Sequence, residues 1–340
     1  MRNGFKVYDT DTHLKPTVET IEPYLDASLL EKARTEWIAD KVPLKTGMAG
    51  EVEKPPFRHL YRFKTGEGGW GGAPPRVLGE AGPSEKPRHF QTFMGTKFPS
   101  YGAGDFDFSA RIRDMDEEGT DVHLMVPGGP SNPGDPELEM GFIQAHHRYL
   151  NDVTSQYPHR LKSLITVTDR SIEGSVQEIK TWGRSNWAVG VILSLNIGKP
   201  LDHPELEPIW RAVEEEGLAV CHHSFAAGYP GYRDLWDNPF LGRLSSHPWG
   251  AMRAVGSFLG AGILDRYPNL RFGILESGFG WLPFWGARMD DQAIYMGYVN
   301  EKLEHKLSEY LSCGRFFAAV VLHEGEKMVK MVNDYLGDHV

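Results

Sequence analysis

The sequence is poor in cysteine, contains no long hydrophobic run and carries no excess of positive charge. Only Cys221 and Cys313 occur among the 340 residues, so we expect no disulfide framework, and a reducing compartment is compatible with the chain. The N-terminus lacks the apolar stretch of a signal peptide, and no run of about 18 apolar residues follows it. We therefore expect a cytoplasmic protein without a membrane span.

A formal net charge of −10 also limits the partners that can be expected. Nucleic acids and anionic membranes are bound by clustered Lys and Arg side chains, which this composition does not favour. The sequence has no G-x-x-x-x-G-K-[ST] loop, and no G-x-G-x-x-G follows a predicted strand, so nucleotide binding is disfavoured. The expected partner is a small-molecule substrate.

Short apolar runs alternate with longer amphipathic segments through most of the chain. Seven runs predict strands, at residues 5–11, 121–129, 161–167, 188–195, 218–224, 270–278 and 316–322. The amphipathic segments predict helices, at 137–157, 171–183, 204–217, 249–267 and 325–337. This order specifies a parallel α/β sheet, and seven strands favour a (β/α) barrel over an open doubly wound sheet. Single barrels reach this length, so we expect one domain over residues 1–340.

Two segments interrupt the alternation. Residues 25–106 are rich in glycine, proline and aromatic residues and show no periodicity. A connection this long predicts either a cap over a site or a mobile surface loop, and its aromatic side chains favour the cap. At the other end a helix stops at Gly337, and His339 and Val340 begin what should be an eighth strand. We expect strand eight to be truncated in the chain as given.

Three predicted strands end in groups that can bind a metal ion, and the active site of a (β/α) barrel lies at the carboxyl ends of its strands. The first strand ends in Asp11 and His13, whose side chains point the same way because they are two residues apart. The fifth ends in His222 and His223, of which only one can face inward, and the sixth ends in Glu276. Carboxylate oxygens and imidazole nitrogens suit zinc, manganese or iron(II), so these residues predict one divalent-metal site.

Each of these residues also has a purely structural interpretation. Asp9, Asp11 and Thr12 can form a polar turn, and either histidine of the pair can be a buried core residue. Glu276 precedes a Ser-Gly pair and can cap the helix that follows. Cys221 lies deeper in its strand, so we do not expect a thiolate ligand.

Four stretches of the sequence resemble the amidohydrolase-related proteins that include aminocarboxymuconate-semialdehyde decarboxylase. They are VYDTDTHLKP, PELEPIWRAVEEEG, LAVCHHS and ILDRYPNLRFGILESGFGWLPFWGARMDD, and YPNLRFGILESGFGWLPF within the last is the most specific part. The resemblance runs over nearly the whole chain apart from residues 25–106. It implies a distorted (β/α)8 TIM barrel with one divalent metal ion, and hydrolytic or non-oxidative decarboxylation chemistry. It also implies a homo-oligomer.

Carried over by position, the resemblance implies Asp11, His13 and His223 as metal ligands. Glu276 stands where many members have a histidine, and a carboxylate there can either bind the ion or act as a base. The last ligand of the family, an aspartate after the eighth strand, would lie beyond Val340, and we expect it to belong to the natural chain. Zinc is the expected ion, with manganese and iron as alternatives.

The predicted function is that of a metal-dependent hydrolase acting on a small aromatic or dienoic carboxylate. Glu276 or His247 would take a proton from a metal-activated water, which then attacks the substrate. One alternative is a non-oxidative decarboxylase that uses the same metal site. An alternative of another class is a catalytically inactive barrel that only binds its ligand.

Three further residues are predicted to bind the substrate. Arg88, in the insertion, can anchor a carboxylate, and Phe279 and Trp281 can contact an aromatic or dienoic body. Trp281 equally fits a packing position behind the sixth strand. His247 equally fits the entry of a helix, with Pro248 in its first turn.

Overall fold

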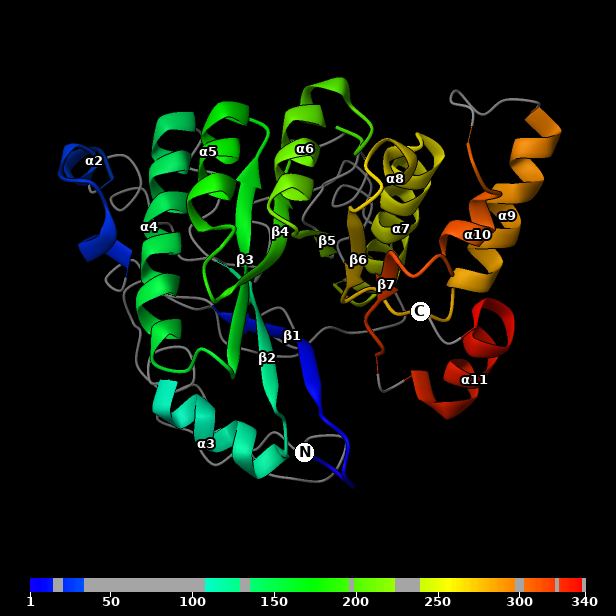
Figure 1. The fold of residues 1–340 in the computed structure, drawn as a ribbon, viewed down its shortest axis with the longest axis horizontal. Helices are drawn as coiled ribbons and strands as arrows, with labels where there is room; N and C mark the ends of the chain where they lie inside the picture. Colours follow the sequence, from blue (N-terminus) through cyan, green and yellow to red (C-terminus); the bar gives the residue numbers. More distant parts are fainter. Residues whose placement is uncertain are drawn as a thin grey trace.

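Seven parallel strands form one sheet in the order of the sequence (Figure 1). The computed structural model describes residues 1–14, 21–33, 108–128, 135–195, 199–223, 239–296, 303–321 and 324–337. Within these ranges the strands are β1 Tyr8–Leu14, β2 Val122–Pro127, β3 Leu161–Thr168, β4 Ala188–Ser194, β5 Ala219–His223, β6 Arg271–Leu275 and β7 Phe316–Ala318. Each strand pairs in parallel with the next. The predicted number of strands and their parallel order are therefore found.

The sheet curls strongly around its own axis. Strands β1 and β5 are four places apart, which in a flat sheet is a separation of about 19 Å. A carboxylate oxygen of Asp11 on β1 nevertheless lies 3.1 Å from the imidazole Nε2 of His223 on β5. Only a sheet bent toward closure brings the carboxyl ends of these two strands together.

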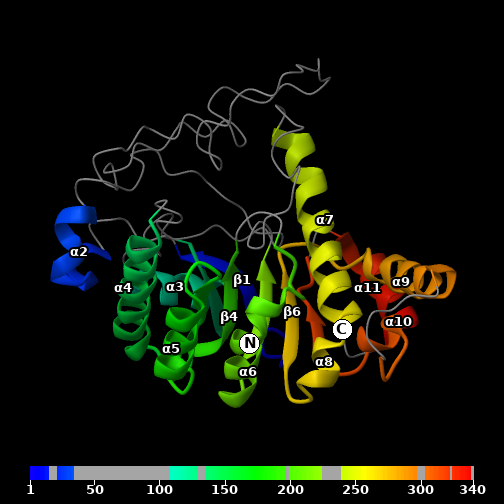
Figure 2. The ribbon, with the colours of Figure 1, turned by 90° about the horizontal axis from the view of Figure 1, so that it is seen from above.

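Helices lie outside the curled sheet, and Figure 2 shows α4, α5 and α6 along its outer side. In the described ranges the helices are η1 Glu22–Tyr24, α2 Ala27–Lys32, α3 Phe108–Glu118, α4 Pro136–Ser155, α5 Ile172–Trp182, η5 Pro204–Leu206, α6 Glu207–Glu215, α7 Pro239–Gly260, α8 Ile263–Arg266, α9 Leu282–Met296, α10 Leu307–Tyr310 and α11 Gly325–Leu336. Local signals start two of them. The side chain of Asp135 accepts a hydrogen bond from Leu138 N–H at the start of α4, and Ser171 accepts one from Gly174 N–H at the start of α5.

The buried apolar residues form two separate clusters, one on each face of the sheet. The outer cluster lies between strands and helices and includes Phe258 of α7 and Phe272 of β6, whose rings stack with centroids 4.2 Å apart. The inner cluster lies inside the curve of the sheet and consists of Val126, Leu164, Ile192, Cys221 and Leu275. Membership of the two clusters therefore tells which way each strand residue points.

The structure differs from the predicted elements at one helix and at the start of the irregular segment. The helix predicted at 249–267 begins earlier, at Pro239, and ends at Gly260, because Gly262 adopts a left-handed φ of 64° and separates α7 from α8. The segment predicted to be irregular from residue 25 contains α2. This helix has only six residues, too few for periodicity to reveal it.

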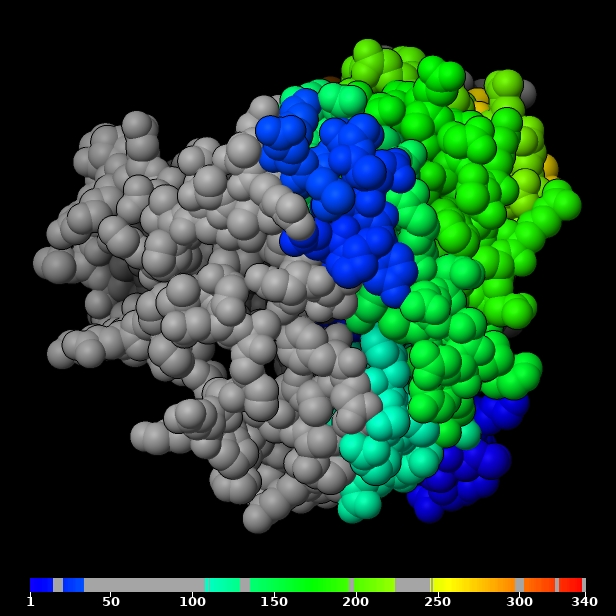
Figure 3. All heavy atoms as spheres, turned by 90° about the vertical axis from the view of Figure 1, so that its left-hand side faces the viewer, coloured from blue at the N-terminus to red at the C-terminus, as the bar shows by residue number. Residues whose placement is uncertain are grey.

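Helix α2 is held on the body of the protein by Lys32. Its ammonium lies 2.7 Å from the Asp135 carboxylate and 3.0 Å from the Glu137 carboxylate at the start of α4, and Figure 3 shows α2 against α4. The rest of the 25–106 insertion, from residue 34, and the expected eighth strand at His339 and Val340 lie outside the described residues. Among the residues that are described, no helix is both long and apolar enough to cross a membrane.

Candidate metal centre

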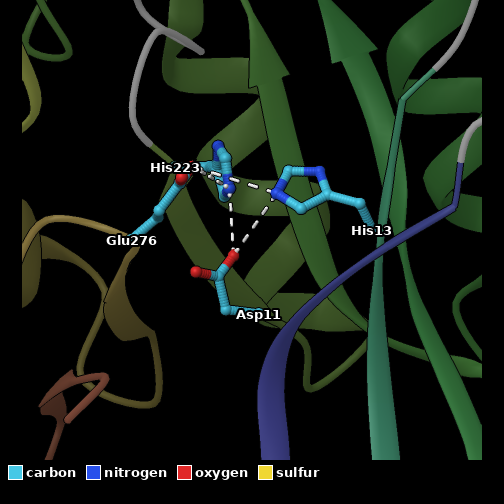
Figure 4. Close-up of side chains that lie close together, drawn as sticks. All are labelled: Asp11, His13, His223 and Glu276. Carbon is cyan, nitrogen blue, oxygen red and sulfur yellow. Dashed lines mark hydrogen bonds and ion pairs between the residues drawn. The ribbon is translucent and has the colours of Figure 1, made fainter. Parts of the chain in front are cut away.

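Four side chains, from β1, from β5 and from the residue after β6, converge at the carboxyl edge of the sheet (Figure 4). Each of Asp11, His13, His223 and Glu276 offers a ligand atom, and these atoms all lie within 4.8 Å of one another. His223 Nε2 is 3.1 Å from Asp11 Oδ1 and 3.1 Å from Glu276 Oε2. His13 Nε2 lies 3.7 Å from the same Asp11 oxygen and 3.9 Å from the same Glu276 oxygen. The two carboxylates and two imidazoles thus face a common centre.

The alternation of strand β5 decides which histidine reaches this centre. Val220 belongs to the outer cluster and Cys221 to the inner one, so His223 points inward and His222 points toward the helices. His222 is 1% exposed, and neither of its ring nitrogens has a hydrogen-bond partner in the described structure. Burial, and then the neighbouring His223, lower the pKa of His222 to about 3. His222 is therefore a neutral core residue.

Strand β1 is shaped locally to present its two ligands. The register with β2 shifts between Asp9 and Thr12, and the Asp9 carboxylate accepts a hydrogen bond of 3.0 Å from the backbone N–H of Asp11. From α3, the buried guanidinium of Arg111 donates to Thr12 Oγ1 at 3.0 Å and to the backbone oxygen of His13 at 3.1 Å. Arg111 thereby anchors the strand segment from which both ligands project.

Glu276 reaches the centre through an unusual backbone conformation. It follows Leu275, which points into the inner cluster, so an extended residue 276 would point outward. Instead Glu276 has a φ of 49° in the left-handed region, which for a residue other than glycine costs on the order of 1–3 kcal/mol. Its carboxylate faces His223 and His13, whereas the N–H groups of Phe279 and Gly280, in the turn before α9, are bound by the carboxylate of Glu324. The helix-capping interpretation of Glu276 stays a prediction.

The spacing of the four groups fits a single divalent cation. Ligands arranged tetrahedrally at about 2.1 Å from zinc are about 3.4 Å from one another. The four carboxylate–imidazole distances range from 3.1 to 3.9 Å and bracket that value. One imidazole Nε2 carries at most one proton and cannot donate to two carboxylates at once, whereas one cation satisfies all four groups.

The four side chains differ in their exposure. The exposed fraction of the side chain is 8% at His223, 20% at Glu276, 29% at Asp11 and 36% at His13. His13 is thus the most exposed of the four side chains and His223 the most buried.

The sequence profile of the amidohydrolase family matches residues 10–301, a range that contains all four side chains. The chain belongs to the amidohydrolase family. Among curated proteins, this amidohydrolase is 24% identical over 250 residues to 2-amino-3-carboxymuconate-6-semialdehyde decarboxylase of Dictyostelium discoideum. That match covers 70% of this chain and 66% of the relative, slightly less than two thirds of the relative's length. The predicted family is thus confirmed.

Solved structures of two 5-carboxyvanillate decarboxylases share the fold. The enzyme of Sphingomonas paucimobilis is 18% identical and aligns with a TM-score of 0.62, over 98% of this chain and 85% of that one. The enzyme of Novosphingobium aromaticivorans, complexed with manganese and 4-hydroxy-3-methoxy-5-nitrobenzoic acid, is 18% identical with a TM-score of 0.62, over 99% and 84%. The predicted TIM-barrel-like α/β fold with an insertion after β1 is confirmed. The membership of this family and the four converging ligand groups agree with the prediction of a metal-dependent enzyme.

The other candidate residues of this amidohydrolase lie in different surroundings. His247 is buried inside α7, and because that helix begins at Pro239, the helix-entry interpretation of His247 and Pro248 is wrong. Phe279 is 2% exposed and belongs to the outer cluster. Trp281 is half-buried and donates its indole N–H to the backbone oxygens of Ser277 and Gly278, both at 3.0 Å.

Roles in catalysis or substrate binding for His247, Phe279 and Trp281 stay predictions, and Arg88 lies outside the described residues. Two residues that the sequence did not single out contact the backbone next to the ligands. They are Arg111, which anchors β1, and Glu324, which binds the turn after β6. No local motif marks either residue, because each reaches the site from a helix distant in the sequence.

Proposed function

We propose that this amidohydrolase is a metal-dependent, non-oxidative decarboxylase of a small aromatic carboxylate. The observation that carries the proposal is the convergence of Asp11, His13, His223 and Glu276 on one centre. The decarboxylase names of the relatives support it, because they belong to both the curated protein and the aligned structures. Decarboxylation, the alternative in the sequence analysis, thereby replaces hydrolysis as the main proposal.

The position of Glu276 also favours decarboxylation. The hydrolytic prediction used this carboxylate as the general base, whereas its Oε2 lies as close to His223 Nε2 as the Asp11 oxygen does, at 3.1 Å. We therefore assign Glu276 to the ligand set together with Asp11, His13 and His223. A carboxylate that binds an ion is less available as a proton acceptor.

Manganese is the ion that we propose first, in place of the zinc expected from the sequence. Two carboxylates and two imidazoles accept manganese, zinc or iron(II), so the donor set alone does not choose among them. The manganese bound in a related structure supports this choice. A divalent ion in this position would act as a Lewis acid on the carboxylate and on an adjacent oxygen of the substrate.

The chain itself must position the substrate and supply one proton. The ring carbon that bears the carboxylate gains the proton, its bond to the carboxyl carbon breaks, and CO2 leaves while the ring carbon keeps the electron pair. His247 is the proposed proton donor, and Arg88 the proposed anchor of a negatively charged substrate group. The exposed side of the centre at His13 is the proposed entry.

The test is an assay of the manganese-loaded full chain on a panel of hydroxybenzoates that carry a carboxylate beside the hydroxyl group. We expect release of one CO2 per product and no incorporation of ¹⁸O from labelled water into the aromatic product. Incorporation of ¹⁸O without CO2 would support hydrolysis instead. A protein that binds no divalent ion and turns over no member of the panel would support the inactive binding barrel.

A further inference from the structure

The turn that carries Glu276 is held by a side chain from the C-terminal part of the chain. Among the described residues with a side chain beyond glycine, only Asn3 and Glu276 have a positive φ. The left-handed conformation at Glu276 is what directs its carboxylate inward, because the preceding Leu275 already points inward. A strained conformation of this kind persists only where the surrounding structure enforces it.

Glu324, at the start of α11, provides the direct restraint on the turn. Its carboxylate oxygens accept hydrogen bonds from the backbone N–H of Phe279 at 2.8 Å and from that of Gly280 at 3.1 Å. One carboxylate thus binds two consecutive amides, with one oxygen on each. Such charge-assisted bonds are stronger and more directional than neutral ones. Helix α11, which supplies Glu324, packs against α9, which follows the turn (Figure 1).

The turn and α11 are in close contact at two glycines. A Cβ on Gly278, whose φ is 68°, would lie 3.0 Å from Glu324 Oε1. A Cβ on Gly280 would lie 2.4 Å from Met328 Sδ and 3.0 Å from the same Glu324 oxygen. An added side chain at either position would therefore crowd the Glu324 carboxylate.

The turn is also restrained from its own side. The hydroxyl of Ser277 donates to the backbone oxygen of Leu275, and the indole of Trp281 donates to the backbone oxygens of Ser277 and Gly278, all at 3.0 Å. These bonds satisfy carbonyl groups, whereas Glu324 satisfies the two N–H groups. In the described structure the N–H groups of Phe279 and Gly280 donate to no backbone oxygen, and the Glu324 carboxylate is their partner.

We infer that Glu324 is a positioning residue for the metal centre: it fixes the 276–281 turn and so places the Glu276 carboxylate where it can bind the ion. The inference rests on the proposed function, because it concerns the same centre. Glu324 acts on the ion only through Glu276. Its loss should therefore weaken ion binding rather than abolish it.

The experiment measures the dissociation constant of Mn²⁺ for the full chain by calorimetry, with circular dichroism as the check of folding. Glu324→Gln keeps the size of the side chain but leaves a single acceptor oxygen, so we expect Mn²⁺ binding about 10- to 100-fold weaker. Glu324→Asp retains the charge on a shorter side chain, so its affinity for Mn²⁺ should lie between that of Glu324→Gln and that of the wild type. Glu326→Gln, an exposed position on the same helix, should bind Mn²⁺ like the wild type.

A double-mutant cycle separates positioning from general destabilisation. In a Glu276→Ala background the restraint has no ligand left to position, so adding Glu324→Gln should weaken Mn²⁺ binding by less than about 2-fold further. The full loss in both backgrounds would overturn the inference, as would wild-type affinity in Glu324→Gln. If Glu324→Gln does not fold, wild-type affinity in Glu324→Asp overturns it. A wild-type chain that binds no Mn²⁺ overturns the proposed function as well.

Discussion

The two adjacent histidines of β5 allow a sharp test of the metal centre. His223 points into the centre and lies 3.1 Å from two carboxylate oxygens, whereas His222 points the other way and has no hydrogen-bond partner in the described structure. Substitution by leucine changes volume little at either position and removes both ring nitrogens. His223→Leu should abolish stabilisation by Mn²⁺, and His222→Leu should preserve it.

The size of the effect follows from linkage. An ion present at 100 times its dissociation constant stabilises the folded chain by about 2.7 kcal/mol. For 340 residues the unfolding entropy is about 0.7 kcal/mol/K, so this stabilisation raises Tm by about 4 °C. Loss of a ligand should weaken binding at least about 100-fold, because outer-shell changes alone reach that size. At the same Mn²⁺ concentration, His223→Leu would then gain only about 0.4 kcal/mol, a shift below about 1 °C.

The assay is thermal unfolding followed by circular dichroism, with and without Mn²⁺, for the wild type and both variants. Without the ion, His222→Leu should have a Tm close to that of the wild type or higher, because it removes buried polar atoms that lack partners. A Mn²⁺ shift that is lost in His222→Leu and kept in His223→Leu would refute the assignment of faces on β5. It would also refute the centre built on that assignment.

Three further predictions concern the surroundings of the centre and the core. Arg111→Lys should weaken Mn²⁺ binding about 10-fold in calorimetry, because one ammonium cannot hold both Thr12 and the His13 carbonyl as the guanidinium does. Burial raises the pKa of Cys221 to about 12, so a thiol reagent at pH 8 should leave it unlabelled in the native chain and label it in urea. Burial, and then the neighbouring His147, lower the pKa of His146 to about 3. Between pH 6.5 and 3 the imidazole is therefore protonated in the unfolded chain but not in the folded one. As the pH is lowered through this range, His146 should reduce the free energy of unfolding by about 1.4 kcal/mol per pH unit.

Each of these predictions has a control. Arg113→Lys, on the exposed side of α3, should leave Mn²⁺ binding unchanged, and an equal loss in both arginine variants would contradict the anchoring role. Cys313 is half-buried and serves as the reference thiol. In urea unfolding, the free energy of unfolding should decrease less steeply below pH 6.5 in His146→Leu than in the wild type. His159→Leu, at an exposed position, should leave this pH dependence unchanged. An unchanged slope in His146→Leu would show that this imidazole is charged in the folded protein.

The sequence predicted the strands better than the segments around them. All seven runs form strands in a single parallel sheet, because a strand buried on both faces has a continuous apolar pattern. Helix α3 was not predicted, the helix after the sixth strand was predicted without a range, and α7 begins ten residues before the predicted start. In these segments the apolar pattern is broken by charged or glycine-rich stretches, and helix formation depends on packing against the sheet.

Three of the proposed ligands, Asp11, His13 and His223, could be predicted from the local sequence and the family resemblance together. The role of Glu276 could not, because capping, base and ligand all suit a carboxylate at the end of a strand. The structure favours the ligand role through the left-handed backbone at this residue and the short distances from its carboxylate to His223 and His13.

What the sequence by itself determined is the kind of atoms available at each strand end and the face on which alternation places them. What only the tertiary structure decided is which of those atoms meet, since a flat sheet would keep β1 and β5 about 19 Å apart. The tertiary structure alone also brings the supporting residues Arg111 and Glu324 to the site. Their contacts join residues 44 to 99 positions apart along the chain, and no local pattern encodes such a distance.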